Sequence, residues 1–300
     1  MTKKLSKIVI ICGQTATGKS GIAVAIAKKY DGEIISADSR QVYHGMDLGT
    51  GKITKREMCG IPHHMLDIAS PNRTFSAGLF QKLGEKKLKD IWKQNKIPII
   101  CGGTGFYIDA LIDGIVFPEV KQNTKLRKQL ERKSVKELFD ILKKKDPKRA
   151  KNIDPQNPHR LIRAIEIAHA LGKVPKLQKR PIYADVLFIG IRKEKKELKK
   201  RISIRLKKRV KAGMIQEIKQ LHKKGVSWKR LESFGLEYKY GALYLQKKVR
   251  KEELILELEK AIMRYAKRQM TWFKRDKRIH WIQNGKEASV LVKKFLENGD

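Results

Sequence analysis

The sequence contains little cysteine. Its 300 residues include three cysteines, Cys12, Cys59 and Cys101, and none of them forms a C-x-x-C pair. This spacing argues against structural zinc, and two of the thiols lie inside apolar runs, where a buried thiol is usual. We therefore expect a reduced, cytosolic protein.

Long apolar runs are also missing. No segment approaches the ~18 consecutive apolar residues of a membrane span. The apolar stretch of the opening segment "MTKKLSKIVIICGQ" stops at Gly13, short of the roughly 7 to 15 residues of a signal peptide. Internal repeats, low-complexity tracts and heptad arrays are absent as well. We therefore expect a soluble, cytoplasmic monomer without a membrane partner.

Acidic residues are greatly outnumbered by basic ones. Lys and Arg number 69 while Asp and Glu number 31, which gives a formal net charge of +38. This excess is far above what solubility requires and indicates a polyanionic partner such as nucleic acid. The alternative is a generally lysine-rich proteome whose proteins carry many solvated cations.

Four short runs are apolar throughout, and helical patterns separate the first three. Such runs are typical of strands in a parallel sheet that helices cover on both faces. The sequence therefore predicts an α/β fold. The runs are "KIVIIC" (7–12), "GEIISAD" (32–38), "KIPIICGG" (96–103) and "DVLFIGI" (185–191).

The stretch between the third and fourth runs, residues 121–184, has a different character. It is rich in Lys, Arg and Gln and carries three helical patterns, "TKLRKQLERK", "SVKELFDILKKK" and "PHRLIRAIEIAHAL". Because it begins after one core strand and ends before another, we interpret it as a basic helical insertion. We expect residues 1–120 and 185–300 to form the two parts of the α/β core.

A strongly basic helix is predicted directly after the fourth run. Apolar residues recur there at every fourth position, which gives the helix one buried stripe. Twelve of the twenty residues from 192 to 211 are Lys or Arg, so the rest of the helix surface is cationic. The stripe consists of Leu198, Ile202, Leu206 and Val210.

The segment "GQTATGKS" fits the phosphate-binding pattern G-x-x-x-x-G-K-[ST] and lies between a predicted strand and a predicted helix. Backbone N–H groups of such a loop surround an anion, Lys19 adds a charge, and the Ser20 hydroxyl suits Mg²⁺. The fold is therefore expected to be a P-loop NTPase-like parallel sheet flanked by helices. The predicted phosphate-binding residues are Gly13, Gln14, Thr15, Ala16, Thr17, Gly18, Lys19 and Ser20.

The acidic residue that P-loop ATPases place at the end of another core strand is missing. The third run instead ends in Gly102, Gly103 and Thr104, which weakens the interpretation as an ATPase. A carboxylate does follow the second run, because Asp38 lies at the carboxyl edge of the predicted sheet, where ligands bind. The alternative role of Asp38 is a helix N-cap or a turn residue.

Six sequence blocks follow one another over nearly the whole chain: "GQTATGKS", "ISADSRQVYHGMDLGTGK", "IPHHMLDI", "IICGGTGFYIDALIDG", "HRLIRAIEI" and "AKRQMTWFKR". In this order they resemble the tRNA dimethylallyltransferase family, also called tRNA isopentenyltransferases. The blocks around Asp38 and Thr104 are far more specific than the phosphate loop. Gln14 departs from the family, which usually has Pro there, and we expect its side chain to face away from the phosphates.

The resemblance implies a prenyl transfer to tRNA. Members of the family move a five-carbon allylic group from dimethylallyl diphosphate to the exocyclic amine of the adenosine 3′ of the anticodon and release pyrophosphate. The loop would then hold the leaving diphosphate, with Lys19 and Mg²⁺ at Ser20 stabilising its charge. In the family the residue corresponding to Asp38 accepts the proton of the amine, so Asp38 is the expected base.

The resemblance also implies contacts with the anticodon stem-loop. A base inside that loop must be pulled from its stack into a pocket, and phosphate contacts elsewhere offset the cost. For any single arginine, a solvated surface role is the alternative. The residues expected to bind tRNA are Asp38, Ser39, Arg40, Gln41, Thr104, Arg127, His159, Arg160, Leu161, Ile162 and Arg163.

Arg201 and Arg205 are four residues apart on the basic helix, so both can reach one anion. The family pattern is consistent with a role on the leaving group, and we expect Arg205 to be catalytic together with Lys19 and Asp38. Contact with the tRNA backbone and a solvated helix face are the alternatives for both arginines.

Two further groups have expected roles. His63 and His64 lie beside Pro62, and without a nearby cysteine or third histidine we expect turn residues rather than metal ligands. In the last block the aromatic residues should pack against the core while the cations face RNA. The aromatic residues are Trp272 and Phe273, and the cations are Lys267, Arg268 and Arg275.

Three other functions remain open. An adenylate isopentenyltransferase would share the core motifs but use free AMP or ATP as the acceptor, for which the basic insertion and the charge of +38 are unnecessary. A P-loop small-molecule kinase would turn over ATP. A non-catalytic RNA-binding protein would have no need of an intact Lys19, Ser20 and Asp38.

Overall fold

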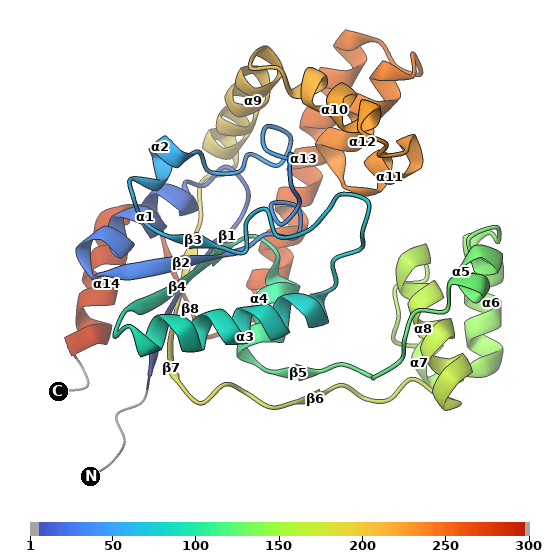
Figure 1. Cartoon of the computed structure of the whole chain (residues 1–300), viewed down its shortest axis with the longest axis horizontal. Helices are drawn as coiled ribbons and strands as arrows, with labels where there is room; N and C mark the ends of the chain where they lie inside the picture. The colour runs from blue at the N-terminus through green and yellow to red at the C-terminus, as the bar shows by residue number, and fades with distance from the viewer. Residues whose placement is uncertain (1–5, 298–300) are drawn as a thin grey trace. The chain divides into compact units, whose positions relative to one another are not determined.

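The computed structural model describes residues 6–297 and is built around a six-stranded sheet in the order β3-β2-β4-β1-β7-β8 (Figure 1). All neighbouring strands of this sheet are parallel. The apolar strands are buried on both faces because helices cover both sides of the sheet. The strands are β1 (Lys7–Gly13), β2 (Gly32–Ala37), β3 (His63–His64), β4 (Ile97–Gly102), β7 (Asp185–Ile191) and β8 (Ile279–Ile282).

The predicted α/β fold with a parallel sheet is confirmed, and each of the four apolar runs forms a strand. The edge strands β3 and β8 were not predicted. The prediction of His63 and His64 as turn residues is wrong, because they pair with Ile34 and Ile35 of β2. His64 Nε2 lies 2.7 Å from Glu33 Oε2, and this contact ties the edge strand to its neighbour.

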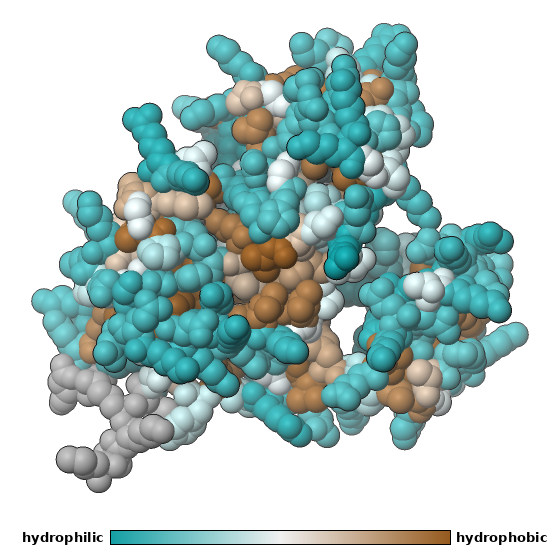
Figure 2. All heavy atoms as spheres, in the orientation of Figure 1, coloured by the Kyte–Doolittle hydropathy of each residue, from teal (hydrophilic) through white to brown (hydrophobic). Residues whose placement is uncertain are grey.

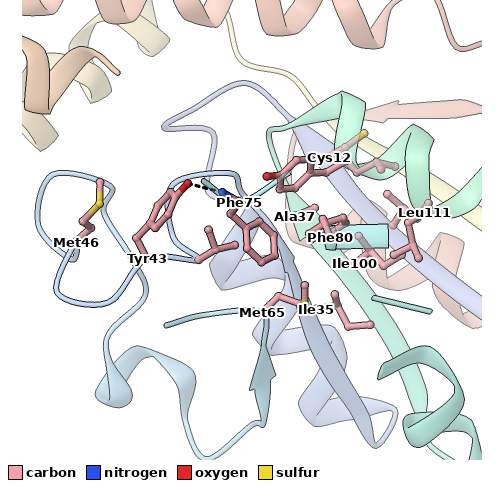
Figure 3. Close-up of a cluster of buried hydrophobic side chains, with 14 of the residues drawn as sticks. Cys12, Ile35, Ala37, Tyr43, Met46, Met65, Phe75, Phe80, Ile100 and Leu111 are labelled. Carbon is pink, nitrogen blue, oxygen red and sulfur yellow. Dashed lines mark hydrogen bonds between the residues drawn. The ribbon is translucent and has the colours of Figure 1, made fainter. Parts of the chain in front are cut away.

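Two apolar layers hold the helices on the sheet. Figure 3 shows part of one layer, in which Ile35 and Ile100 from the strands lie with Phe80 and Leu111 from the covering helices. A fully buried side chain of this size contributes about 1.5–3 kcal/mol. One layer involves α3 (Ala77–Lys93), α4 (Gly105–Ile112) and α13 (Lys251–Phe273), and the other involves α1 (Lys19–Lys29) and α14 (Gly285–Glu297).

The basic helix predicted after the fourth run is α9, and its apolar stripe is confirmed. Leu198, Ile202 and Leu206 are buried and pack in one cluster with Leu258 and Ile262 of α13. Three shorter helices follow α9 before α13 begins. These helices are α9 (Lys195–Lys211), α10 (Met214–Lys223), α11 (Trp228–Ser233) and α12 (Leu236–Leu245).

Residues 115–180 form a compact unit of their own with a separate apolar core. It starts and ends in the antiparallel pair β5 (Ile115–Val116) and β6 (Gln178–Lys179). Each of its helices has a polar N-cap whose side chain accepts a backbone N–H. The helices are α5 (Thr124–Leu130), α6 (Val135–Lys145), α7 (Pro147–Ala150) and α8 (Pro158–Leu171).

The face drawn in Figure 2 is mainly hydrophilic, in line with the 69 basic residues of the sequence. Between residues 6 and 297, no helix combines the length and the apolar character that crossing a bilayer would require.

The link between β2 and α3 is irregular apart from β3 and α2 (Lys55–Met58).

The burial of two thiols is confirmed. Cys12 and Cys101 are buried in the sheet, whereas Cys59 is exposed. Burial raises the pKa of Cys12 to about 12 and that of Cys101 to about 11. Both buried thiols therefore stay protonated at neutral pH, and they act as small apolar side chains.

Candidate active site

The phosphate loop connects β1 to α1 at the carboxyl edge of the sheet. Gly13 has a φ of +134°, and a Cβ atom there would lie 2.5 Å from the carbonyl oxygen of Ile191 in β7, so only glycine fits. Gly18, with a φ of +94°, ends the loop, and Lys19 is the first residue of α1. The N-terminus of α1 is thereby available to an anion.

Two side-chain amides, one from the loop and one from α13, link this loop to its surroundings. Gln269 of α13 accepts the Thr15 N–H at 2.8 Å and donates to the Gly103 carbonyl at 2.9 Å. The Gln14 amide donates to the Ala266 carbonyl at 3.0 Å, so it is turned toward α13, in line with the expectation that it faces away from the phosphates. Sequence reasoning missed Gln269, whose only signal was its place in the block "AKRQMTWFKR".

Lys19 is the cation of the loop. Its Nζ donates to the Gln14 carbonyl at 2.5 Å, and the Thr17 hydroxyl donates to the same oxygen at 2.9 Å. Burial lowers the pKa of Lys19 and the charge of Arg205 lowers it further, whereas the Asp38 carboxylate raises it. Among residues 6–297 no carboxylate forms an ion pair with Lys19, so an anion entering the loop would relieve the cost of burying this charge.

Asp38 directly follows β2 at the same edge of the sheet. Its Oδ1 accepts the N–H groups of Arg40 at 2.8 Å and of Gln41 at 3.4 Å, which fixes the carboxylate in a turn. Its charge also influences the pKa values of groups on α1, β4, α4, α9, α12 and α13, so these elements converge around it. The groups are Lys19, Cys101, Tyr107, Arg205, Arg209, Glu237 and Tyr265.

The "GGTG" turn after β4 packs on the turn of Asp38. The Thr104 N–H donates to the Ala37 carbonyl at 3.1 Å, and the Ser39 N–H donates to the Thr104 hydroxyl at 3.1 Å. A Cβ atom at Gly102 would overlap the Ala37 carbonyl, so glycine permits this approach. The structure thus brings Ser39 and Thr104 together, two of the residues expected to bind tRNA.

Arg205 of α9 shares a carbonyl partner with Gln41, which follows the Asp38 turn. Its Nη2 donates to the Gly51 carbonyl at 3.2 Å, and the Gln41 amide donates to the same oxygen at 3.3 Å. Burial, followed by the charge of Arg209, lowers the pKa of Arg205 to about 10. Arg205 therefore remains charged at neutral pH.

Arg201, one turn earlier on α9, lies near the rim of the phosphate loop. A Cβ atom at Gly18 would be 4.0 Å from its Nη1. Its Nε donates to Glu197 at 2.8 Å in an exposed pair, and Lys193 approaches the same carboxylate at 3.5 Å. Both arginines are thus near the loop, and Arg205 is the more buried of the two.

In the unit of residues 115–180, the block around the start of α8 is divided between surface and core. His159 and Arg160 are exposed in the first turn. Contact of Leu161 and Ile162 with tRNA stays a prediction, although their side chains are buried, at 0% and 7% exposure. The reason for the burial is the helical period, which places Leu161 on the same face as Ile165 in the core.

Arg127 and Arg163 share a carboxylate partner inside this unit. Arg127 donates to Glu166 at 2.6 and 2.7 Å, Arg163 donates at 2.9 Å, and the Asn123 N–H adds a further hydrogen bond at 2.9 Å. Burial opposes the charge of Glu166, but the hydrogen bonds from both arginines outweigh it and lower the pKa of this carboxyl. Arg127 therefore ties α5 to α8, and the contact of both arginines with tRNA stays a prediction.

Replacing Glu166 by glutamine is expected to destabilise this unit by about 2 kcal/mol, because two guanidinium groups lose their charge partner. Hydrogen exchange of the α8 amides measures the loss. Because the folded unit lowers the pKa of Glu166, the ionised carboxylate stabilises the fold at pH values above the ordinary pKa of glutamate. The wild-type unit should therefore lose this stability as the pH falls through the lowered pKa, and the variant should not.

The control for this substitution is Glu137→Gln, which alters an exposed capping-box residue of α6 in the same unit. It should cost clearly less stability, because water replaces the lost contacts. Equal losses for the two variants would contradict a special role of Glu166.

The aromatic residues of the last block pack as predicted. Phe273 belongs to the buried core, and Trp272 packs against it while its Nε1 donates to Asp109 at 3.2 Å. Arg275 lies over the Trp272 ring at 4.2 Å, and Arg268 lies over the ring of Tyr265 at 5.6 Å. These two cations therefore cover aromatic faces of α13, and their contact with RNA stays a prediction.

Lys267 lines a cavity of about 660 Å³ beside α13. On a helix, residues two positions apart point about 200° apart, so Lys267 faces away from Tyr265 and Gln269, which lie toward Asp38 and the phosphate loop. The cavity nevertheless borders the phosphate loop, because Gln14 also lines it. Its other basic lining residues are Arg192, Lys193, Lys195, Arg264 and Lys274.

Comparisons with known proteins agree with this site. The family model described as IPP transferase matches residues 41–276. A tRNA dimethylallyltransferase 2 of Treponema denticola is 44% identical, with 91% of this chain and 95% of the relative covered. A tRNA dimethylallyltransferase 2 of Trichlorobacter lovleyi is 41% identical, with 96% of each chain covered.

Solved structures agree in fold as well. The crystal structure of tRNA isopentenylpyrophosphate transferase from Bacillus halodurans has a TM-score of 0.73 at 35% identity, with 98% of this chain and 96% of that chain covered. A eukaryotic dimethylallyltransferase acting on tRNA has a TM-score of 0.81 at 25% identity, with coverages of 98% and 80%. The resemblance seen in the six sequence blocks is confirmed, and the chain belongs to the IPP transferase family.

Proposed function

We propose that the chain transfers a dimethylallyl group from dimethylallyl diphosphate to the exocyclic amine of the adenosine 3′-adjacent to the anticodon of tRNA. Pyrophosphate is the second product. The observation that carries this proposal is the sheet register, in which Cys12 before the phosphate loop and Ala37 before Asp38 both pair with Gly102 at one edge of the sheet. A cation that binds phosphate and a carboxylate that accepts a proton are the two groups that prenyl transfer to an amine requires.

The phosphate loop is suited to a leaving diphosphate. Cleavage of the allylic C–O bond develops negative charge on the diphosphate, and preorganised donors stabilise that charge as it forms. Lys19, the loop N–H groups and Arg205 are the donors that we assign to this role. Because no water molecule has to be activated, the missing acid at the end of β4 is consistent with the reaction.

Mg²⁺ fits the donor set of this site. The ion prefers oxygen ligands and is usually held by one or two protein groups together with phosphates and water. Ser20 in the first turn of α1 supplies one such oxygen, and residues 6–297 contain no cluster of three or more His, Cys, Asp and Glu that could hold a metal alone. When bound, Mg²⁺ would neutralise charge on the diphosphate.

Asp38 is the proton acceptor in this proposal. The exocyclic amine of adenine is a poor nucleophile because its lone pair is delocalised into the ring, so removal of its proton assists formation of the C–N bond. The turn N–H groups hold Oδ1. No hydrogen bond from residues 6–297 reaches Oδ2, which leaves this oxygen for the amine.

The charge of the chain favours RNA as the acceptor. A free nucleotide carries few phosphates, whereas a stem-loop offers many, and each contact releases counterions. Exposed cations such as Arg160 on α8 can reach such phosphates. Ser39 and Thr104, which meet beside Asp38, are placed to contact the nucleotides around the target base.

The test uses the purified full chain with labelled dimethylallyl diphosphate, Mg²⁺ and either unmodified tRNA or AMP. We expect label in tRNA and none in AMP. Label in AMP would indicate an adenylate isopentenyltransferase, and ATP turnover without prenyl transfer would indicate a kinase. Binding of tRNA without any transfer would leave a non-catalytic RNA-binding protein.

A further inference from the structure

The link between β2 and α2 contains a loop of residues 47–52, "DLGTGK", which we call the Gly51 loop. Its Gly51 carbonyl accepts hydrogen bonds from Arg205 and Gln41. Within residues 6–297, Arg205 forms no ion pair, so this carbonyl is the group that orients its guanidinium. The conformation of the Gly51 loop therefore determines where Arg205 points.

Glu217 of α10 binds three consecutive N–H groups of the Gly51 loop. Its Oε2 accepts the N–H of Asp47 at 2.9 Å and that of Leu48 at 2.7 Å, and its Oε1 accepts the N–H of Gly49 at 3.0 Å. Successive N–H groups that converge on an anion form a backbone nest. Hydrogen bonds to an ionised acceptor are roughly twice as strong as neutral ones, so Glu217 fixes this half of the loop.

Tyr238 of α12 donates the fourth hydrogen bond to the same carboxylate. Its hydroxyl lies 2.7 Å from Glu217 Oε1, and its ring lies against Gly49, where a Cβ atom would be 2.6 Å from Cζ. Burial, together with the charge of Glu217, raises the pKa of Tyr238, so the hydroxyl stays protonated and donates. Each oxygen of Glu217 thus accepts two hydrogen bonds.

Lys52 anchors the other end of the loop. Its side chain is 5% exposed and pairs with Asp47 and Asp67, both at 2.6 Å. It also donates to the Tyr43 carbonyl at 3.0 Å. The Gly51 loop is therefore held at both ends, and the carbonyl between them is presented in one direction.

The presented carbonyls face two arginines of α9. Arg209 donates to the Gly49 carbonyl at 3.5 Å and pairs with Glu237 at 3.3 Å, while Arg205 binds the Gly51 carbonyl. A Cβ atom at Gly51 would overlap both guanidinium groups, so glycine permits this close contact. Movement of the loop would consequently move Arg205.

We propose that Glu217 is a positioning residue, which holds the Gly51 loop so that its carbonyl directs Arg205 toward the diphosphate. The inference rests on the proposed role of Arg205 on the leaving group. Glu217 acts through four hydrogen bonds that its carboxylate accepts from protein groups. In a glutamine variant an NH₂ group would replace one carboxylate oxygen, and this donor would face two of the four donors.

The experiment is a double-mutant cycle of Glu217→Gln and Arg205→Ala, read as the affinity of the full chain for inorganic pyrophosphate with Mg²⁺ by calorimetry. We expect E217Q to weaken binding about tenfold and R205A about 30-fold. The double variant should bind about as weakly as R205A alone, because Glu217 acts through Arg205. Prenyl transfer by E217Q should show a lower kcat with an unchanged KM for tRNA.

Additive losses in the double variant, or a wild-type affinity of E217Q, would overturn the inference. Glu257→Gln, an exposed change on α13, is the matched control and should bind like the wild type. If E217Q fails to fold, Tyr238→Phe is used instead, and we expect it to weaken pyrophosphate binding two- to threefold. An unchanged affinity of this variant would also overturn the inference. Because pyrophosphate binding needs no acceptor, an absence of transfer to tRNA would refute the proposed function separately.

Discussion

Replacing Asp38 by asparagine is expected to lower the single-turnover rate of prenyl transfer by about 10²–10⁴-fold, the usual contribution of a general base. Asparagine keeps an oxygen that can accept the turn N–H groups of Arg40 and Gln41. The turn should therefore persist while the proton acceptor is lost. Rapid-quench measurements with saturating enzyme isolate this step, and the dissociation constant for tRNA should stay unchanged.

Asp90→Asn is the matched control for this substitution, because Asp90 lies on the surface of α3 and pairs with Lys87 at 3.5 Å. Its rate should equal that of the wild type. A single-turnover rate of D38N near the wild-type value would exclude Asp38 as the base. A rate loss accompanied by an equal loss of tRNA affinity would instead assign Asp38 to RNA binding.

Replacing Lys19 by alanine is expected to reduce kcat by about 10²–10³-fold, the range for removing one preorganised group from a developing charge. Lys19 occupies the first position of α1, and its Nζ bends back to the Gln14 carbonyl at 2.5 Å. A bound diphosphate would draw this ammonium away from the carbonyl. Pyrophosphate affinity and kcat should therefore fall together, whereas affinity for tRNA should persist.

The Lys19 variant should also change the pH dependence of pyrophosphate binding. Because burial lowers the pKa of Lys19, its ammonium loses the proton at a lower pH than an ordinary lysine. Wild-type affinity should thus begin to fall at a lower pH than the pKa of an ordinary lysine would give, and that of K19A should change less. Lys28→Ala, in the last turn of the same helix, is the control, and parallel pH profiles for wild type and K19A would contradict this assignment.

The sheet was largely predictable because its inner strands are buried on both faces and their sequences are apolar without interruption. The edge strands β3 and β8 were not, since each is short and carries histidines and half-buried positions. Their pairing depends on neighbours far away in the sequence, as in the contact between His64 and Glu33. The local sequence pattern does not indicate such contacts.

The candidate site was predictable where one segment contains the whole chemistry. The phosphate loop is such a segment, and Asp38 was found from its place after a strand. Gln269 and Glu217 were missed, because each acts on backbone groups more than 160 residues away. Nothing in the local sequence distinguishes a glutamine or a glutamate that binds distant N–H groups from one that is solvated.

In the helical unit of residues 115–180, the family block and the helical pattern lead to different predictions. Leu161 and Ile162 were assigned to tRNA through the family block, although the apolar spacing of α8 already predicted that Leu161 faces the core. The partnership of Glu166 with Arg163 is an ordinary pair three residues apart and could have been read from the sequence. Its partnership with Arg127, from another helix, could not.

The bracing of the phosphate loop has a consequence for synthesis of the chain. The loop leaves the ribosome early, but the amide that binds Thr15 follows 254 residues later. Of the two strands beside β1, β4 pairs Ile99 with Val9, whereas β7 pairs Asp185 with Lys7 and is made much later. In a nascent chain the edge of β1 that pairs with β7 therefore lacks its partner for more than half of translation, and the fold depends on contacts of high sequence separation, which are slow to form. Catalytic competence should arise only once α13 has emerged, so partially translated chains cannot consume the allylic donor.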